Sequence, residues 1–222
     1  MFLIAATATS YIFFIAATAE SQQEKNNDGG NAKEDFEEQN IIQICCTWGH
    51  DLRDGILTYY TDNEGSHKQQ DKVRSAVQEW DRNIDSIKLE EISNKKNGDI
   101  LIEFQEVYEG IGGAKRVLGQ SINRFDNNGF IDKVEITVYR GTSEYKFDRD
   151  IVQRIVEHEM GHALGLGHAN FDGNLMAEKV NDRTKNVSEC EVNAVLQANY
   201  WKLIADSTNP VIPERNVILC NE

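Results

Sequence analysis

One stretch of eleven residues decides how this chain folds: His158-Glu159-Met160-Gly161-His162-Ala163-Leu164-Gly165-Leu166-Gly167-His168. The first two histidines are four residues apart on an expected helix, so both imidazoles project from one face. That spacing suits two ligands of a single zinc ion. A third ligand, His168, reaches the same ion only if the chain leaves the helix and turns back. Gly165 stands where such a turn needs a residue that tolerates positive φ.

The residue after the first histidine indicates what such a site does. Glu159 can reach a water molecule on the metal without binding the metal itself. Zinc lowers the pKa of a bound water to about 7 and polarises a bound carbonyl. A carboxylate beside that water can accept its proton and later deliver it to a leaving amine. A closed structural site would need a fourth ligand, and no further Cys or His lies close by. We therefore expect one catalytic zinc ion, with Glu159 as general base and then general acid.

The composition fits one mid-sized domain with short appendages. The chain has 222 residues, of which 40% are hydrophobic, and a net charge of −14. This acidic balance argues against nucleic acids and anionic membrane surfaces as partners, because both attract basic patches. We expect a monomer that acts on a protein or peptide.

The N-terminal segment predicts export. Residues 1–19 carry no charged side chain, and the chain turns polar at Glu20. Ala17-Thr18-Ala19 fits a signal-peptide cleavage site, although no Lys or Arg precedes the apolar stretch. A segment of this length could also remain as a membrane anchor. We expect a secreted protein in the first case and a protein on the extracellular face of the membrane in the second. Residues 20–44 are acidic and indicate a disordered tether.

Export permits disulfides. The four cysteines, Cys45, Cys46, Cys190 and Cys220, allow three pairings. A bridge between the two adjacent cysteines would be strained. We therefore expect Cys45 and Cys46 to pair with Cys190 and Cys220, in either order, which would clamp both chain ends onto one body. Four free thiols are the alternative.

Hydrophobic spacing places the remaining elements. Helical spacing predicts helices over residues 71–83, from 148 or 150 to 164, and 188–203. Alternation predicts strands at residues 56–60, 87–89, 100–104, 117–124 and 134–138, with a tight turn at 128–129. This order indicates a single α/β or α+β domain over residues 45–205, followed by a tail, 206–222, tethered by a disulfide.

The extended motif resembles a known family. Three histidines in the order HExxHxxGxxH, followed by a methionine, resemble the metzincin metalloproteases. The methionine is Met176, eight residues after His168, and the resemblance implies that it packs beneath the zinc site without binding the metal. Gly161 to His168, with Ala169 after the third histidine, is similar to the matrixins, the group of the matrix metalloproteases.

The resemblance covers about residues 45–205 and implies both fold and activity. It implies a twisted, mostly parallel five-stranded sheet with an antiparallel edge strand, two long helices above the zinc cleft and a C-terminal helix. It also implies a zinc-dependent endopeptidase of the kind that works in the extracellular matrix. In matrixins an edge strand above the zinc pairs antiparallel with the substrate backbone. Leu118, Gly119 and Gln120 resemble that strand, and a plain core strand with a glycine bulge is the alternative.

Several features depart from the matrixin pattern. The chain has no cysteine-switch motif, and residues 99–150 contain no histidine, so we expect no second, structural zinc. Ala177-Glu178 replaces the Tyr-Pro that usually follows the methionine. Asp126 and the two asparagines after it offer oxygens to calcium, but a turn also explains them, so no calcium site is assigned.

Two functions fit these residues. The first is the endopeptidase, and the second is a binding module at the cell surface that holds zinc and no longer cuts. All three expected ligands and Glu159 are present, which favours the enzyme.

Overall fold

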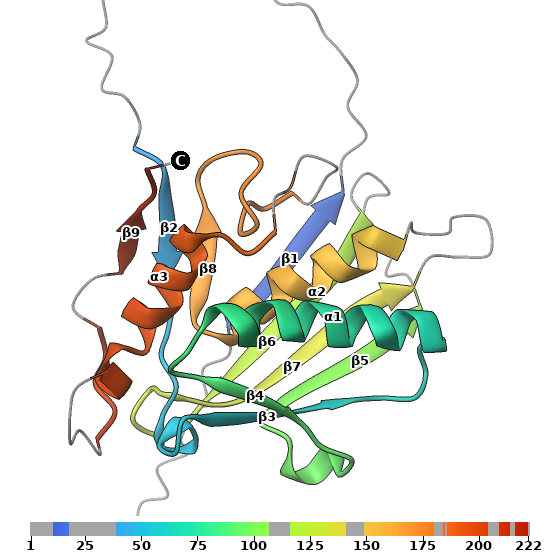
Figure 1. Cartoon of the computed structure of the whole chain (residues 1–222), viewed down its shortest axis with the longest axis horizontal. Coiled ribbons are helices and arrows are strands. Elements are labelled where there is room, and N and C mark those ends of the chain that lie inside the picture. Colours follow the sequence, from blue (N-terminus) through green and yellow to red (C-terminus); the bar gives the residue numbers. More distant parts are fainter. Residues whose placement is uncertain are drawn as a thin grey trace, which may run out of the picture.

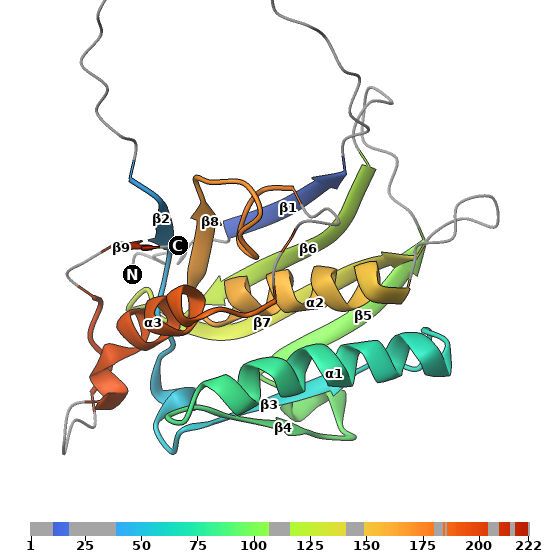
Figure 2. The ribbon, with the colours of Figure 1, turned by 45° about the horizontal axis from the view of Figure 1, so that its top comes forward.

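Two long helices cover one face of a six-stranded sheet (Figures 1 and 2). The computed structural model describes residues 11–17, 39–106, 116–140, 149–179, 184, 186–203, 209–213 and 216–221. Across the sheet the strands are β1 (Tyr11–Ala17), β6 (Arg116–Phe125), β7 (Ile131–Arg140), β5 (Ile100–Glu106), β3 (Ile56–Thr61) and β4 (Lys88–Glu91).

Five of these strands form the predicted mostly parallel sheet. Strands β4, β3, β5 and β7 run parallel to one another, and β6 pairs antiparallel with β7. The turn between β6 and β7 follows the predicted hairpin, with Gly129 at φ +83°. The Asp126 carboxylate accepts hydrogen bonds from the backbone N–H groups of Asn128 and Phe130, at 2.8 and 2.9 Å. Its oxygens therefore hold the turn.

The sixth strand changes the edge of the sheet. β1 belongs to the apolar segment for which a leader or an anchor was expected, and it pairs antiparallel with β6. The five-stranded sheet with its antiparallel strand β6 is confirmed, and in this structure the backbone of β1 pairs with the outer side of β6 as an additional strand. Among the described residues, no helix has the length and apolar character needed to cross a membrane.

The first helix, α1 (His67–Asn83), begins four residues before the predicted start. Ser66 and Gln69 form a capping box, which satisfies backbone N–H groups that have no partner inside the helix. The buried face of α1 packs against the sheet and against α2 (Arg149–Ala163), the helix that carries the histidine motif. The Trp80 indole N–H donates to the backbone carbonyl of Glu157 at 2.8 Å and joins the two helices.

A second, small sheet brings both ends of the domain together. Strand β2 (Ile41–Ile44) pairs with β8 (Leu166–Ala169) on one side and with β9 (Val217–Leu219) on the other. Residues 41–44 are therefore a strand and not part of a tether, and residues 217–219 of the predicted tail join the domain. Residues 20–38 lie outside the described residues.

The C-terminal helix is shorter than predicted. α3 (Glu189–Ala198) starts at the predicted capping box of Ser188, and a short 3-10 helix follows at Tyr200–Leu203. The break falls at Asn199, whose buried side chain bonds to the backbone of residues on two other segments, Trp48 and Leu164.

The expected disulfide pairing is wrong. Cys190 is joined to Cys220, and the adjacent Cys45 and Cys46 are joined to each other. Cys190 lies in the first turn of α3, and Cys220 follows β9, so the fold places their Cα atoms 5.6 Å apart. The pairing of β2 with β9, and not a disulfide, connects the N-terminal end of the domain to its tail.

Candidate metal centre

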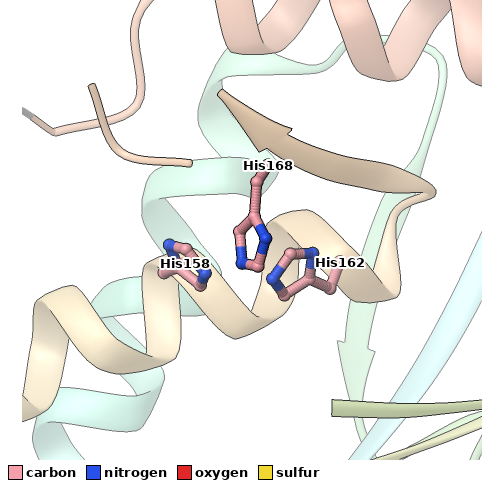
Figure 3. Close-up of side chains that lie close together, drawn as sticks. All are labelled: His158, His162 and His168. Atoms are coloured by element: carbon pink, nitrogen blue, oxygen red, sulfur yellow. The ribbon is translucent and has the colours of Figure 1, made fainter. Parts of the chain in front are cut away.

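The three histidines of the motif meet at one point (Figure 3). His158 and His162 extend from α2, and His168 extends from β8. The ring centres of His158 and His162 are 4.6 Å apart. The ring centre of His168 lies 5.5 Å from that of His158 and 4.9 Å from that of His162. One potential ligand atom from each ring lies within 4.8 Å of the other two. Among the described residues, this is the group of potential metal ligands that the fold brings together.

A sharp turn brings the third histidine back. α2 ends at Ala163, and Gly165 follows with φ +103°, as the sequence predicted. A Cβ atom at Gly165 would lie 2.5 Å from the backbone oxygen of Cys46, so the turn also needs a residue without a side chain for space. The chain then runs straight into β8.

Backbone carbonyls fix the orientation of two imidazoles. Nδ1 of His158 lies 2.6 Å from the carbonyl oxygen of Leu175, and Nδ1 of His162 lies 2.8 Å from that of Leu166. A carbonyl oxygen only accepts hydrogen bonds, so each Nδ1 carries the proton and donates it. The lone pair therefore resides on Nε2 of each ring, the atom that a metal would bind.

Burial keeps the imidazoles neutral. Desolvation lowers the pKa of His158 to about 3, and it lowers the pKa of His162 well below the ordinary value. Burial also lowers the pKa of His168, while the negative charge of Glu178 raises it. A neutral imidazole is the form that binds a metal ion. Nε2 of His158 is buried and has no hydrogen-bond partner, which is costly unless a cation occupies the site.

Glu159 is fully buried between α2 and β6. Desolvation raises the pKa of its carboxyl group to about 8, and a hydrogen bond from Ser121 lowers it. Oε2 accepts that bond at 2.7 Å, whereas Oε1 has no hydrogen-bond partner. A cation bound by the neighbouring imidazoles would lower this pKa, because an opposite charge favours the carboxylate.

Met176 packs beneath the helix that carries the histidines. A Cβ atom at Gly161 would lie 2.4 Å from the sulfur of Met176, so the glycine leaves room for the thioether against α2. The backbone N–H of Met176 donates to the Asn174 side chain at 2.8 Å, which holds the turn in place. The side chain is fully buried.

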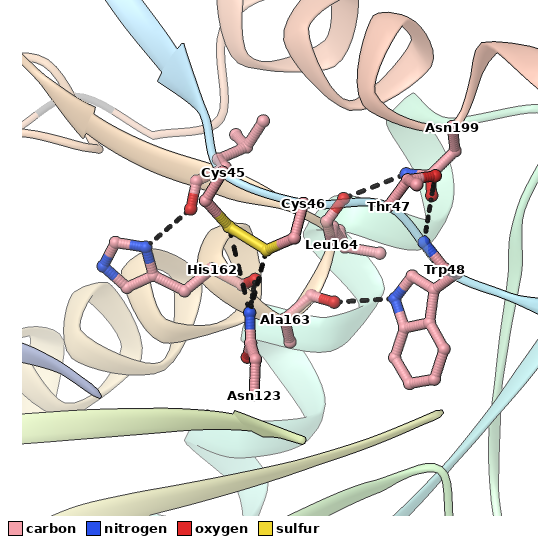
Figure 4. Close-up of a disulfide and its surroundings, with 10 residues drawn as sticks. Cys45, Cys46, Thr47, Trp48, Asn123, His162, Ala163, Leu164 and Asn199 are labelled. Atoms are coloured by element: carbon pink, nitrogen blue, oxygen red, sulfur yellow. Dashed lines mark hydrogen bonds between the residues drawn. A yellow bond between two sulfur atoms is a disulfide. The ribbon is translucent and has the colours of Figure 1, made fainter. Parts of the chain in front are cut away.

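Three side chains that the motif does not predict secure the end of α2 (Figure 4). The last carbonyls of a helix have no partner within the helix. Here the amide of Asn123 donates to the carbonyl of His162 at 3.2 Å, and the indole of Trp48 donates to that of Ala163 at 2.7 Å. Asn199 donates to the carbonyl of Leu164 at 2.9 Å. The Asn123 amide also lies 3.3 Å from the sulfur of Cys46, so the Cys45–Cys46 disulfide adjoins the same helix end.

Sequence reasoning missed Ser121 and Asn123, although one signal was available. Residues 119, 121 and 123 lie on one face of a strand because side chains alternate. Gly119 of the predicted substrate strand lies directly over Glu159, and the two polar residues that follow on this face also meet α2. Polar residues at successive inward positions of a strand indicate a partner on the covering element.

The predicted substrate strand is paired on its outer side. Leu118 and Gly119 are buried, and Gln120 accepts a hydrogen bond from the Tyr139 hydroxyl at 3.1 Å. Backbone pairing places Phe14 of β1 opposite Gln120 and Phe13 opposite Ser121. Beyond the third histidine, a pocket of about 290 Å³ is lined by residues 169–172 and 177–179.

Comparison with known proteins gives a family. The matrixin family model of the M10 peptidases matches residues 48–200, which include the whole motif. No curated protein matches the chain in a sequence comparison. Among solved structures, that of myroilysin is similar to this chain at 18% sequence identity and a TM-score of 0.37. The match covers 58% of this chain and 54% of that one, and likeness at this level carries no argument about activity.

Proposed function

Because this chain belongs to the matrixin family of metallopeptidases, we propose that it is an exported zinc-dependent endopeptidase in which Glu159 moves the proton. The observation that carries the proposal is the convergence of His158, His162 and His168 within 4.8 Å, with the fully buried Glu159 directly after the first of them on α2. The same residues without Glu159 would support metal binding alone.

The residues fit a zinc ion. His158, His162 and His168 would hold it through three neutral nitrogens, two of them in rings whose tautomer is fixed by a carbonyl. Three protein ligands leave a position open for water or substrate. When bound, zinc supplies a water of lowered pKa and a positive charge that stabilises the oxygen of the attacked carbonyl.

Glu159 would transfer the proton during hydrolysis. Oε1 has no hydrogen-bond partner, while Ser121 holds the other oxygen, so Oε1 is the atom able to accept the proton of the attacking water. The same carboxyl group then delivers this proton to the amine that leaves when the peptide bond breaks. Burial favours the first of these two transfers, in which the carboxylate takes up the proton, because the protonated form of a buried carboxyl group is the less costly one.

The substrate would bind along β6 in the place that β1 holds. An extended peptide that adds to a sheet edge gains main-chain hydrogen bonds. β1 already makes such bonds to β6, in the antiparallel direction. Removal of residues 1–19 during export would take β1 away and free this edge. Export and access to substrate would then depend on the same cleavage after Ala19.

Cleavage of a protein substrate tests the activity. The purified chain starting at Glu20 should hydrolyse a quenched fluorescent casein. A zinc chelator should abolish the cleavage, and added zinc should restore it. Glu159→Ala should bind one zinc per chain and fail to cleave. One bound zinc without cleavage of a broad peptide set by the unaltered chain would contradict the proposal and favour the binding module.

Two further measurements test export and access. N-terminal sequencing of the protein in the culture medium should find Glu20 as the first residue, and a chain that stays on the membrane with residues 1–19 intact would contradict secretion. The chain starting at Met1 should cleave casein at least about tenfold more slowly than the chain starting at Glu20, because β1 competes for the strand-addition edge. Equal rates would contradict a role for β6 in holding substrate.

A further inference from the structure

Ser121 contacts the catalytic carboxyl group from the sheet. Ser121 and Glu159 have no exposed surface, and the Ser121 Oγ atom lies 2.7 Å from Glu159 Oε2. The same hydroxyl lies 3.1 Å from the backbone oxygen of Glu159. Both acceptors belong to one residue, and the carboxylate is the nearer and the stronger of the two. The hydroxyl therefore ties the side chain of Glu159 to β6.

The same strand makes no hydrogen bond to the second carboxylate oxygen, Oε1. Gly119 stands two residues before Ser121 and faces the same side. A Cβ atom at Gly119 would lie 2.5 Å from Glu159 Oε1. The contacts of β6 with the two oxygens therefore differ, since Ser121 donates a hydrogen bond to Oε2 and Gly119 places no side chain against the buried Oε1.

We propose that Ser121 is a positioning residue that fixes Glu159 through Oε2 and thereby selects Oε1 as the oxygen that exchanges the proton. This inference rests on the proposed hydrolytic function. A carboxyl group attached through a flexible side chain must be held within a fraction of an ångström to transfer a proton efficiently, and small displacements can cost about 100-fold in rate. The Ser121 hydroxyl is the hydrogen-bond donor that the structure places on this buried carboxyl group, and Oε1 has no such partner, so the hydroxyl defines the rotamer.

The test removes the hydroxyl and then restores it. Ser121→Ala should lower kcat by about 10- to 100-fold. It should leave KM within about twofold and zinc content at one per chain, because no metal ligand changes. Ser121→Thr keeps a hydroxyl and should recover kcat to within about fivefold of the original. Thr137→Val serves as a matched control, since it removes a hydroxyl from the adjacent strand β7 opposite Gln120, on the other face.

A spectroscopic measurement separates this inference from the activity itself. The ¹³Cδ resonance of Glu159, identified by its loss in Glu159→Gln, should shift in Ser121→Ala and return in Ser121→Thr. If the unaltered chain lacks zinc-dependent cleavage, the proposed function fails, and this resonance still decides whether Ser121 holds the carboxyl group. An unchanged resonance, an unchanged kcat, or a loss of kcat that matches a loss of zinc or folded protein would overturn the positioning role.

Discussion

Helix α2 buries two glutamates, and different elements hold their carboxyl groups. Glu157 and Glu159 are both fully buried and flank His158. Desolvation raises the pKa of both carboxyl groups, that of Glu159 to about 8. The Glu157 carboxylate accepts a hydrogen bond from Gln153 of the same helix at 2.8 Å. Glu159 is held by the sheet.

Glu157 and Glu159 differ in the residues that contact them. The backbone carbonyl of Glu157 accepts a hydrogen bond from the Trp80 indole of α1, and this contact joins the two helices. Glu159 receives a hydrogen bond from a serine of β6 on one carboxylate oxygen and has no hydrogen-bond partner on the other, and it directly follows the first of the three converging histidines. Burial and a raised pKa are therefore common to both and do not by themselves identify a catalytic acid. The position of Glu159 in the histidine motif and its contact with Ser121 distinguish it from Glu157.

The largest expected effect comes from neutralising each glutamate in turn. Glu159→Gln should lower kcat by about 1,000-fold, since general acid–base catalysis contributes about 10²- to 10⁴-fold. Glu157→Gln should keep kcat within about threefold, because it moves no proton in the reaction. Both variants should retain one zinc per chain. Steady-state kinetics on one quenched peptide measures the two effects. Equal losses of kcat in the two variants would contradict the different roles of Glu157 and Glu159.

Removal of the Cys190–Cys220 disulfide should lower the stability of the fold without changing catalysis. The Cys190–Cys220 disulfide closes a loop with a sequence separation of 30. In the chain-entropy account, its loss should reduce the free energy of unfolding by about 3.5 kcal/mol. The paired change Cys190→Ser with Cys220→Ser should lower the urea midpoint and leave kcat unaltered. A matched pair at Cys45 and Cys46, whose separation is 1, should remove little loop entropy. A fall in kcat for the first pair would mean that the tail contributes to the site.

A methyl group added to Gly119 of β6 should test whether Glu159 needs the room that this glycine leaves. Gly119→Ala would bring its Cβ to 2.5 Å from Glu159 Oε1 and 2.6 Å from Ile155 Cγ2. Forced repacking of a buried site costs about 1–3 kcal/mol. We expect kcat to fall by about tenfold as Glu159 is displaced. Gly98→Ala is the control, because its Cβ would meet the end of the Leu101 side chain at 3.0 Å, Tyr60 Cβ at 3.4 Å and the Ile100 carbonyl oxygen at 3.5 Å. Unchanged kinetics in Gly119→Ala would show that Oε1 does not need this space.

The smallest expected effect is a change in how stability depends on pH. The native pKa of Glu157 is raised, so above about pH 4.5 the unfolded state has lost a proton that the native state retains. Stability contributed by this group is present below that pH and is lost as the pH rises towards the native pKa. Glu157→Gln removes this loss and should raise the melting temperature more at pH 8 than at pH 4.5. Thermal melts at the two pH values measure it, and an equal shift at both would contradict a buried, titrating Glu157.

Much of the fold was predictable from local patterns. The spacing of Val73, Val77 and Trp80 predicted α1, and the alternating residues predicted β3, β5, β6 and β7. The capping box of Ser188 predicted the start of α3, and Gly165 predicted the turn with positive φ. Each of these features depends on residues within one or two turns of one another.

The features that were wrong or missed depend on contacts far apart in the chain. The disulfide pairing follows from β9 joining β2, which no pattern near the cysteines encodes. Asn199 interrupts the last helix because Trp48 and Leu164, distant in sequence, bond to its side chain. The early start of α1 was missed for a local reason, since the capping box of Ser66 precedes the first apolar residue.

The sequence by itself determined the three histidines that form the candidate metal site and the glutamate that follows the first of them. A helix of 3.6 residues per turn places His158 and His162 on one face, and the glycine after the helix allows His168 to return. Only the tertiary structure decided which oxygen of Glu159 is held, through Ser121, and which strand covers β6. The physical reason is range: helical geometry acts over four residues, whereas the contact between Ser121 and Glu159 spans 38 and exists only once β6 packs beneath α2.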